Sequence, residues 1–328
     1  MPPISLLEII IISSRLDNLR RVKKIAETYG AVILAMIFWS VSFIWFKMAN
    51  EVYRPVTIVY IRLVISVILL SVFLFFTRNF VKIKKKDWKL FILLSVFEPF
   101  FYFLGESFGL TYVTATVGSV LISTIPVIAT LGAWIIFRER LKLINYAGII
   151  LSFIGVLVFI INNDGSLSFN VKGLLLMTLA VFSAVGYNLT LSRLVGSYGP
   201  VFIVNVQNVI GAILFLPVFL IFEVRPLTAT PFDIRHFLPI IELALFASCG
   251  AFILFAFSVK NMGITRANIF SNCIPIFTAL FSFILLGEKL SVRNLIGMAI
   301  VIAGLFMSQI NGHREKIDDA LTLTGKTA

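Results

Sequence analysis

The chain has 328 residues, of which 59% are hydrophobic and 13% are charged, and its formal net charge is +12. Soluble proteins carry about 25% charged residues on average, so this composition excludes a soluble domain with a polar shell. The positive charge does not indicate nucleic-acid binding, because the Lys and Arg residues fall in the turns between apolar runs.

A basic segment, residues 1–28, opens the chain, and we expect it to be a partly helical cytoplasmic tail that lies on the membrane surface. The remaining length allows about ten membrane spans of roughly 20 residues. Ten apolar runs follow, at residues 29–49, 56–76, 88–108, 114–136, 142–162, 171–192, 200–222, 237–259, 264–286 and 292–310. A second charged tail, residues 311–328, closes the chain. We therefore predict an all-α integral membrane protein with ten transmembrane helices.

The distribution of Lys and Arg predicts the orientation of these spans. With the N-terminus inside, the cytoplasmic segments hold 20 of the 28 Lys and Arg residues, the outer segments hold seven, and Arg62 lies within a span. Such an excess marks the cytoplasmic side. We therefore expect both termini in the cytoplasm and residues 223–236 outside. The membrane would be a plasma membrane, which in a bacterium is the inner membrane.

The first three spans carry charged and aromatic side chains near their outer ends. Lys47 and Arg62 lie at a depth that Glu106 of the third span also reaches. We interpret these three residues as a structural charge cluster, since charges inside a membrane pair with one another. Trp39 and Tyr102 are expected near a substrate cavity between the spans, where their rings could stack against a planar substrate.

The third span also carries Glu98, directly before Pro99. At a rise of about 1.5 Å per residue, Glu98 lies about 15 Å beyond Trp88, near the middle of a hydrocarbon core about 30 Å thick. A charged carboxylate costs about 2.5–3.5 kcal/mol there on insertion scales, and no cation is expected at its own depth. We predict that Glu98 takes up and releases a proton. The alternative is a carboxyl that a hydrogen bond from another helix keeps permanently neutral.

The fourth and ninth spans repeat one another. Residues 123–141 and 272–290 align at a shift of 149 positions, and this shift places a proline, a glutamate and two later glycines on residues of the same type. Each half then holds five spans, an odd number, so the second half enters the membrane from the opposite side. We predict two inverted five-helix repeats, residues 29–162 and 171–310, an arrangement typical of transporters with two alternating open forms.

A proline lies near the middle of each repeated span, at Pro126 and Pro275. Each proline frees the carbonyl four residues earlier, so both should face protein or a wet cavity. Small polar residues accompany them: Ser119, Ser123, Asn268, Ser271 and Asn272. We predict that prolines and polar residues line one substrate cavity; the alternatives are packing kinks and helix–helix contacts. Glu139 and Glu288, in the following turns, are expected to be solvated beside Arg or Lys.

These features together resemble the drug/metabolite transporter superfamily, and most closely its EamA-type branch. The resemblance covers roughly residues 30–310 and rests on the ten spans in two halves, the two Ile-Pro pairs and the turns R-E-R-L and G-E-K-L. Arg62, in Y-I-R-L of the second span, also fits the pattern. The resemblance implies a secondary transporter of small organic metabolites, with amino-acid-like solutes and export favoured. We expect a monomer or homodimer in the lipid bilayer that binds a small-molecule substrate and, through Glu98, protons.

No sequence motif indicates a cofactor, a metal or a catalytic centre. The phosphate-binding pattern G-x-x-x-x-G-K-[ST] is absent, and the two histidines, His236 and His313, are expected in loops. An ATP-driven pump or a metalloenzyme is therefore disfavoured, and we expect neither cofactor nor metal. Two alternatives stay open. One is a carrier of the same fold for uptake or exchange of sugars, nucleosides or organic acids, and the other is a membrane scaffold or lipid-modifying enzyme.

Overall fold

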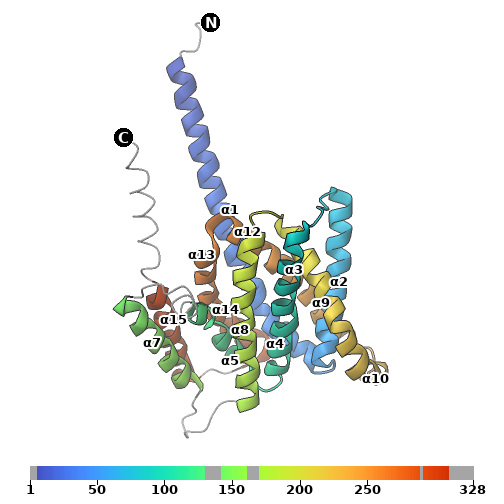
Figure 1. Ribbon diagram of the computed structural model, residues 1–328. Helices are drawn as coiled ribbons and strands as arrows, with labels where there is room; N and C mark the ends of the chain where they lie inside the picture. The colour runs from blue at the N-terminus through green and yellow to red at the C-terminus, as the bar shows by residue number, and fades with distance from the viewer. Residues whose placement is uncertain (1–5, 130–141, 161–169, 289–290, 310–328) are drawn as a thin grey trace.

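The computed structural model describes the backbone of residues 6–129, 142–160, 170–288 and 291–309, which leaves out Glu139 and His313. Every regular element in this part of the chain is a helix (Figure 1). Seven helices are long and apolar enough to cross a membrane. Three shorter apolar helices, Ala115–Ala129, Leu143–Phe159 and Val292–Ser308, occupy the positions of the other predicted spans. The predicted all-α membrane fold is confirmed.

The elements follow the order of the predicted spans. The first half contains α1 (Leu6–Asn50), α2 (Pro55–Thr77), a 3₁₀ turn (Lys85–Asp87), α3 (Trp88–Ser95), a π-helical segment (Val96–Phe101), α4 (Tyr102–Leu110), α5 (Ala115–Ile122) and α7 (Leu143–Ile160). The second half contains α8 (Val171–Leu194), α9 (Pro200–Phe222), α10 (Val224–Ala229), α11 (Ile234–Glu242), a π-helical segment (Leu243–Ala251), α12 (Phe252–Met262), α13 (Ile264–Ile269), a 3₁₀ turn (Phe270–Cys273), α14 (Ile274–Phe281), a π-helical segment (Ser282–Leu286) and α15 (Val292–Gln309).

The first helix is longer than predicted. Residues 6–50 form one continuous helix, which projects from the bundle on the N-terminal side (Figure 1). The run contains no proline and only one glycine, Gly30, so nothing in it stops a helix. Residues from 6 onwards are therefore helical and continuous with the first span.

The third span is interrupted at its centre. Pro99 lacks the N–H that would continue the helical ladder, and the residue before a proline is disfavoured in the helical region. Glu98 accordingly has an extended backbone, with φ −147° and ψ 116°, inside the π-helical segment that joins α3 to α4. The predicted span 88–108 is therefore not one continuous helix, and Glu98 lies at its break.

The two repeated spans are interrupted at matching places. The helix of span four stops at Ile122 and resumes just before Pro126. In span nine a 3₁₀ turn separates α13 from α14, whose second residue is Pro275. The carbonyl of Ser271, which the proline deprives of its usual partner, accepts the N–H of Ile274 instead. Such helix breaks inside a membrane bundle require protein or a cavity beside them.

The carboxylate of Glu223, at the end of α9, caps the first turn of α2. It accepts the N–H of Val56 at 3.2 Å, the N–H of Thr57 and the Thr57 hydroxyl at 2.6 Å. Carboxylates are favoured at helix N-termini, where backbone N–H groups have no partner within the helix. This contact joins the two halves at the end of the bundle opposite residues 78–89.

Glu288 makes a similar contact at the same end. Its carboxylate accepts the N–H of Ala115 at 3.2 Å and the hydroxyl of Thr116 at 2.7 Å, both in the first turn of α5. Lys47 lies close enough to interact with it electrostatically. Glu288 is therefore a cap that joins the two repeated spans, and not the solvated turn residue that the sequence predicts. Its repeat partner Glu139 lies outside the described residues.

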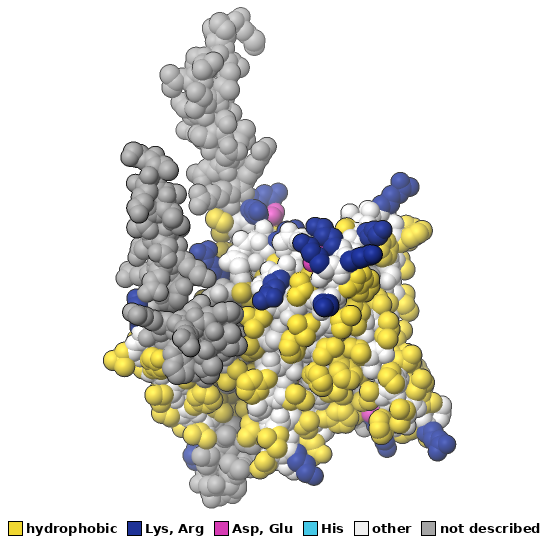
Figure 2. Space-filling view, viewed as in Figure 1, with side chains coloured by type: hydrophobic (Ala, Val, Ile, Leu, Met, Phe, Trp, Pro, Cys, Tyr) yellow, Lys and Arg dark blue, Asp and Glu magenta, His cyan; other side chains and the backbone are white. Residues whose placement is uncertain are grey.

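Hydrophobic side chains cover the face of the bundle that Figure 2 shows, and most of the Lys and Arg side chains on this face gather at one end. The gathered basic residues include the loop between α2 and α3, which is held in place by Tyr198. The Tyr198 hydroxyl donates to Asp87 at 2.8 Å and accepts the N–H of Lys84 at 3.1 Å. An apolar belt with one basic end is typical of a membrane protein whose basic end faces the cytoplasm.

Candidate functional site

A cavity lies in the middle of the helix bundle, where the interrupted spans meet. Its walls come from α1, α2, the broken third span, the break in span four, α8, α12 and the break in span nine. The cavity is lined mainly by apolar side chains, with a few charged and polar groups among them. A cavity of this composition between the helices of a bundle is a usual place for a small-molecule site.

Three charged residues line this cavity: Arg62, Glu98 and Glu106. Their side chains are almost fully enclosed, with exposed fractions of 3%, 6% and 8%. Buried charges are retained only when other charges or hydrogen bonds stabilise them. Glu106 accepts the hydroxyl of Tyr102 at 2.9 Å. Arg62 interacts electrostatically with both carboxylates.

Glu98 has a cation in its surroundings, which differs from the sequence prediction. Arg62 and Glu98 line the same cavity and interact electrostatically. Depth along the chain could not reveal this, because it fixes neither the rotation of a helix nor the break at Pro99. Within the described residues, no hydrogen bond to the Glu98 carboxyl is recorded. Its carboxyl is therefore open to the cavity for a proton or a substrate cation.

The predicted charge cluster is divided. Arg62 and Glu106 face the cavity, whereas Lys47 is not part of its lining. The Lys47 ammonium donates a hydrogen bond to the carbonyl of Leu110 and lies near Glu288. Lys47 therefore belongs to the end of the bundle where Glu288 caps α5, and only Arg62 and Glu106 belong to the candidate site.

The polar residues of the two repeated spans are used differently. Asn268 and Ser271 line the cavity, and Asn268 accepts a hydrogen bond from Asn188 at 3.2 Å. In contrast, Ser119 and Ser123 are fully enclosed and donate to carbonyls of their own helix, at 2.8 and 2.7 Å.

Five of the predicted lining residues are not part of the cavity lining: Ser119, Ser123, Pro126, Asn272 and Pro275. Span four instead contributes Ile122 and Ile125 to the wall, and these two residues flank its break. In span four the lining therefore consists of apolar residues and not of the two serines. In span nine, Asn268 and Ser271 lie in the wall, while Asn272 and Pro275 are not part of it.

Aromatic rings form most of the apolar wall. Trp39 and Tyr102 lie in the cavity lining, together with Phe43, Phe103, Tyr187, Phe252 and Phe255. The Trp39 ring lies 5.3 Å from Phe252 and 5.0 Å from Phe255, measured between centroids. Sequence reasoning missed these phenylalanines, Tyr187 and Asn188. With 33 phenylalanines in the chain, no local signal separates a cavity residue from one that contacts lipid.

The cavity can hold a molecule that carries charges of both signs on an apolar body. A cation and two carboxylates lie among aromatic rings, with the amides Asn188 and Asn268 on another part of the wall. Within the described residues, no group of three or more His, Cys, Asp or Glu is placed to hold a metal ion.

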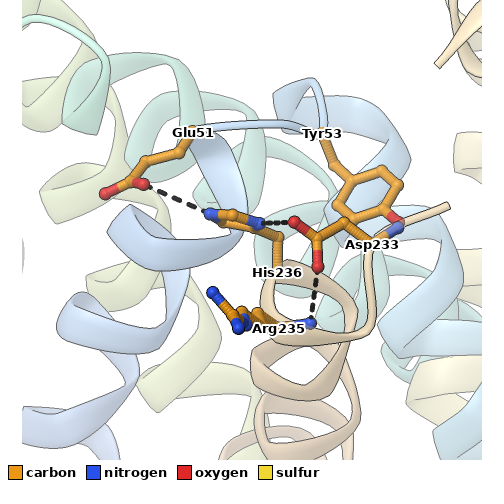
Figure 3. Close-up of polar contacts among 5 residues, drawn as sticks. All are labelled: Glu51, Tyr53, Asp233, Arg235 and His236. Atoms are coloured by element: carbon orange, nitrogen blue, oxygen red, sulfur yellow. Dashed lines mark hydrogen bonds and ion pairs between the residues drawn. The ribbon is translucent and has the colours of Figure 1, made fainter. Parts of the chain in front are cut away.

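A second polar cluster contains Glu51, Asp233 and His236, together with the backbone N–H of Arg235 (Figure 3). His236, in the first turn of α11, lies with Nδ1 2.7 Å from Asp233 and Nε2 3.3 Å from Glu51. The backbone N–H of Arg235 and the ring of His236 hold the pKa of the exposed Asp233 carboxyl below its usual range. These contacts join the loop after α1 to the start of α11 and lie apart from the cavity.

The sequence matches the EamA-like transporter family over residues 28–161 and 171–309. Two proteins of Archaeoglobus fulgidus, each named an uncharacterized transporter, are 27% and 26% identical; the matches cover 84% and 88% of this chain and 95% and 99% of theirs. The uncharacterized transporter YetK of Bacillus subtilis is 25% identical, over 76% of each chain. A crystal structure that is 15% identical superimposes with a TM-score of 0.66, over 87% of this chain and 98% of its own, and shows the same fold.

Proposed function

Because this chain belongs to the EamA-like transporter family and is an integral membrane transporter, we propose that it is a secondary transporter that carries small organic metabolites through the central cavity by alternating access. The observation that carries this proposal is the cavity itself, with Arg62 and Glu98 on its wall and Glu98 at a helix break. Interrupted helices near the bilayer midplane are where secondary transporters bind their substrates.

The favoured substrate is an amino-acid-like solute with a large apolar side chain. Arg62 suits a carboxylate, because a guanidinium donates several parallel hydrogen bonds to one. Glu98 suits an ammonium group, and the rings of Trp39 and Phe252 suit an apolar or planar side chain. We therefore use L-phenylalanine as the first probe.

Other substrate classes fit the wall less well. Nucleotides and polyvalent acids would meet one cation and two carboxylates. A sugar needs many polar partners, whereas most of the side chains in the lining are apolar or aromatic. Uptake or exchange of such metabolites by the same fold is the alternative function. Membership of a transporter family weighs against a scaffold or an enzyme.

We also propose export coupled to proton entry, with both termini in the cytoplasm and the protein in a plasma membrane. Export is supported by the resemblance to exporters of the same branch. Coupling is supported by the place of Glu98 in the cavity, open to a proton and to substrate. Export against a gradient then follows if substrate and proton favour Glu98 in opposite states.

The test uses the purified full chain in liposomes, with labelled L-phenylalanine, L-leucine, glucose, uridine and citrate as separate probes. We expect the two amino acids to be carried faster than in protein-free liposomes, and accumulated when a pH gradient is imposed. Transport of glucose, uridine or citrate instead would favour the alternative carrier. Transport of none, with correctly folded protein, would contradict a metabolite transporter of this kind.

The orientation makes a separate prediction about residues 223–236. A cysteine at exposed Thr228, on a background with Cys249→Ala and Cys273→Ala, should react in intact cells with a maleimide that cannot cross the membrane. A cysteine at Lys85, in the basic loop, should react only after the cells are opened. The reverse pattern would place the termini outside.

The place of Asn268 predicts that a bulky side chain there blocks transport. Asn268→Trp should reduce L-phenylalanine transport by at least about tenfold, because an indole at this position occupies cavity space that substrate must enter. Ile269→Trp, one residue along the same helix and not part of the lining, is the matched control. Equal transport by both variants, at equal membrane levels, would mean that substrate does not pass Asn268.

A further inference from the structure

The guanidinium of Arg62 is held by two groups that carry no charge. Its Nε donates to the hydroxyl of Ser248 at 2.8 Å, across the contact between α2 and the π-helical segment of span eight. Its central carbon lies 4.1 Å from the centroid of the Phe103 ring, so the cation rests on an aromatic ring. These contacts use one of the five N–H donors that a guanidinium possesses.

The two nearby carboxylates do not bind the Arg62 guanidinium directly. Glu98 and Glu106 interact with Arg62 electrostatically, but neither forms a direct ion pair with it among the described residues. A buried cation would ordinarily gain most from a hydrogen-bonded carboxylate. Ser248 and Phe103 therefore hold the guanidinium in place while its four terminal N–H groups remain available in the cavity wall.

Ser248 differs from most enclosed serines of the described spans. Serines such as Ser40, Ser66 and Ser95 donate their hydroxyl to the carbonyl four residues earlier in their own helix. The Ser248 hydroxyl instead accepts a hydrogen bond from a charged group of another span. Its position is fixed in turn, because its carbonyl accepts the Asn208 amide of α9 at 3.2 Å. A π-helical segment widens the helix locally, and such segments are frequent at functional sites.

We propose that Ser248 is a positioning residue for substrate recognition. It turns the Arg62 guanidinium so that the terminal N–H groups present a planar pair of donors to a substrate carboxylate. This inference rests on the proposed function for its ligand, and it adds the residue that gives the site its preference for a carboxylate. The competing view is that Ser248 only packs α2 against span eight.

The test compares Ser248→Ala with Ser66→Ala. Ser66 is equally enclosed at the same contact. Its hydroxyl donates to the backbone carbonyl of Arg62 at 2.6 Å, with the carbonyl of Ala244 at 3.2 Å, and has no hydrogen bond to the guanidinium. The readout is the half-saturating concentration of L-phenylalanine and the inhibition by phenethylamine, which has the same body without the carboxylate. In Ser248→Ala we expect the half-saturating concentration of L-phenylalanine to rise about tenfold, as for the loss of a hydrogen bond to a charged group. Inhibition by phenethylamine should stay unchanged. Ser66→Ala should change the binding of L-phenylalanine and of phenethylamine equally, or change neither.

If Ser248→Ala weakened the binding of L-phenylalanine and of phenethylamine equally, Ser248 would have a packing role, and the proposal would be overturned. A second readout needs no substrate: modification of Arg62 by phenylglyoxal, followed by peptide mass spectrometry. We expect modification to be several-fold faster in Ser248→Ala than in the wild type or in Ser66→Ala. An unchanged rate would also overturn the proposal. If this rate rises while the wild type carries no amino acid, the substrate class is wrong and the positioning role stands.

Discussion

Arg62→Met is expected to reduce L-phenylalanine transport by about 100-fold, the largest loss we expect from a single cavity substitution. The guanidinium is the only cation in the described lining of the cavity, so a substrate carboxylate would lose its partner. Hydrogen bonds to charged groups contribute about 1.5–3 kcal/mol each, and a carboxylate can accept two from one guanidinium. Initial rates of uptake into liposomes, at matched amounts of inserted protein, measure the effect.

Arg62→Lys separates charge from geometry. A lysine keeps the positive charge near Glu98 and Glu106 but lacks the planar pair of donors, so we expect a loss smaller than that of Arg62→Met. Removing the charge altogether leaves two enclosed carboxylates without their cation, which destabilises a fold. Thermal unfolding of both variants is therefore measured beside transport. Normal transport by a folded Arg62→Met variant would show that substrate does not bind this residue.

Most of the fold follows from hydropathy and charge, because a membrane demands helices of a set length and every backbone donor paired within them. The positions of the ten spans could be predicted for that reason. The break at Glu98 was visible in principle, since Pro99 restricts the residue before it. That the break would bring Glu98 into one cavity with Arg62 could not be predicted. Counting depth along an ideal helix assumes that the helix is continuous.

The lining of the cavity depends on helix rotation, which sequence alone gives only by assumption. The repeat placed Ser119 and Ser123 beside Asn268 in a common polar lining, yet Ile122 and Ile125 occupy the wall in span four. The glutamate caps were beyond prediction for a related reason. From the sequence alone, Glu288 is a turn residue. Its partners at the start of α5 are more than 170 residues away along the chain and become neighbours only in the folded protein.

Glu98→Gln is expected to abolish proton-driven accumulation of substrate while downhill exchange continues. Glutamine has nearly the shape of a protonated glutamate but neither binds nor releases a proton. An enclosed carboxyl favours its neutral form where the surroundings are dry and its charged form where water or a cation reaches it. Alternating access would supply that change of surroundings, because the cavity at the break of span three opens to one side and then to the other.

The measurement is L-phenylalanine accumulation in liposomes with an imposed pH gradient, beside exchange of labelled for unlabelled substrate without one. Glu106→Gln is the matched control, since Glu106 lines the same cavity but is bonded to the Tyr102 hydroxyl. We expect this variant to bind substrate less well and still to accumulate it. A Glu98 carboxyl that is permanently neutral would serve packing only, and its glutamine variant would accumulate substrate as the wild type does. That result would end the case for proton coupling through Glu98, because no titrating group would then be needed at this position.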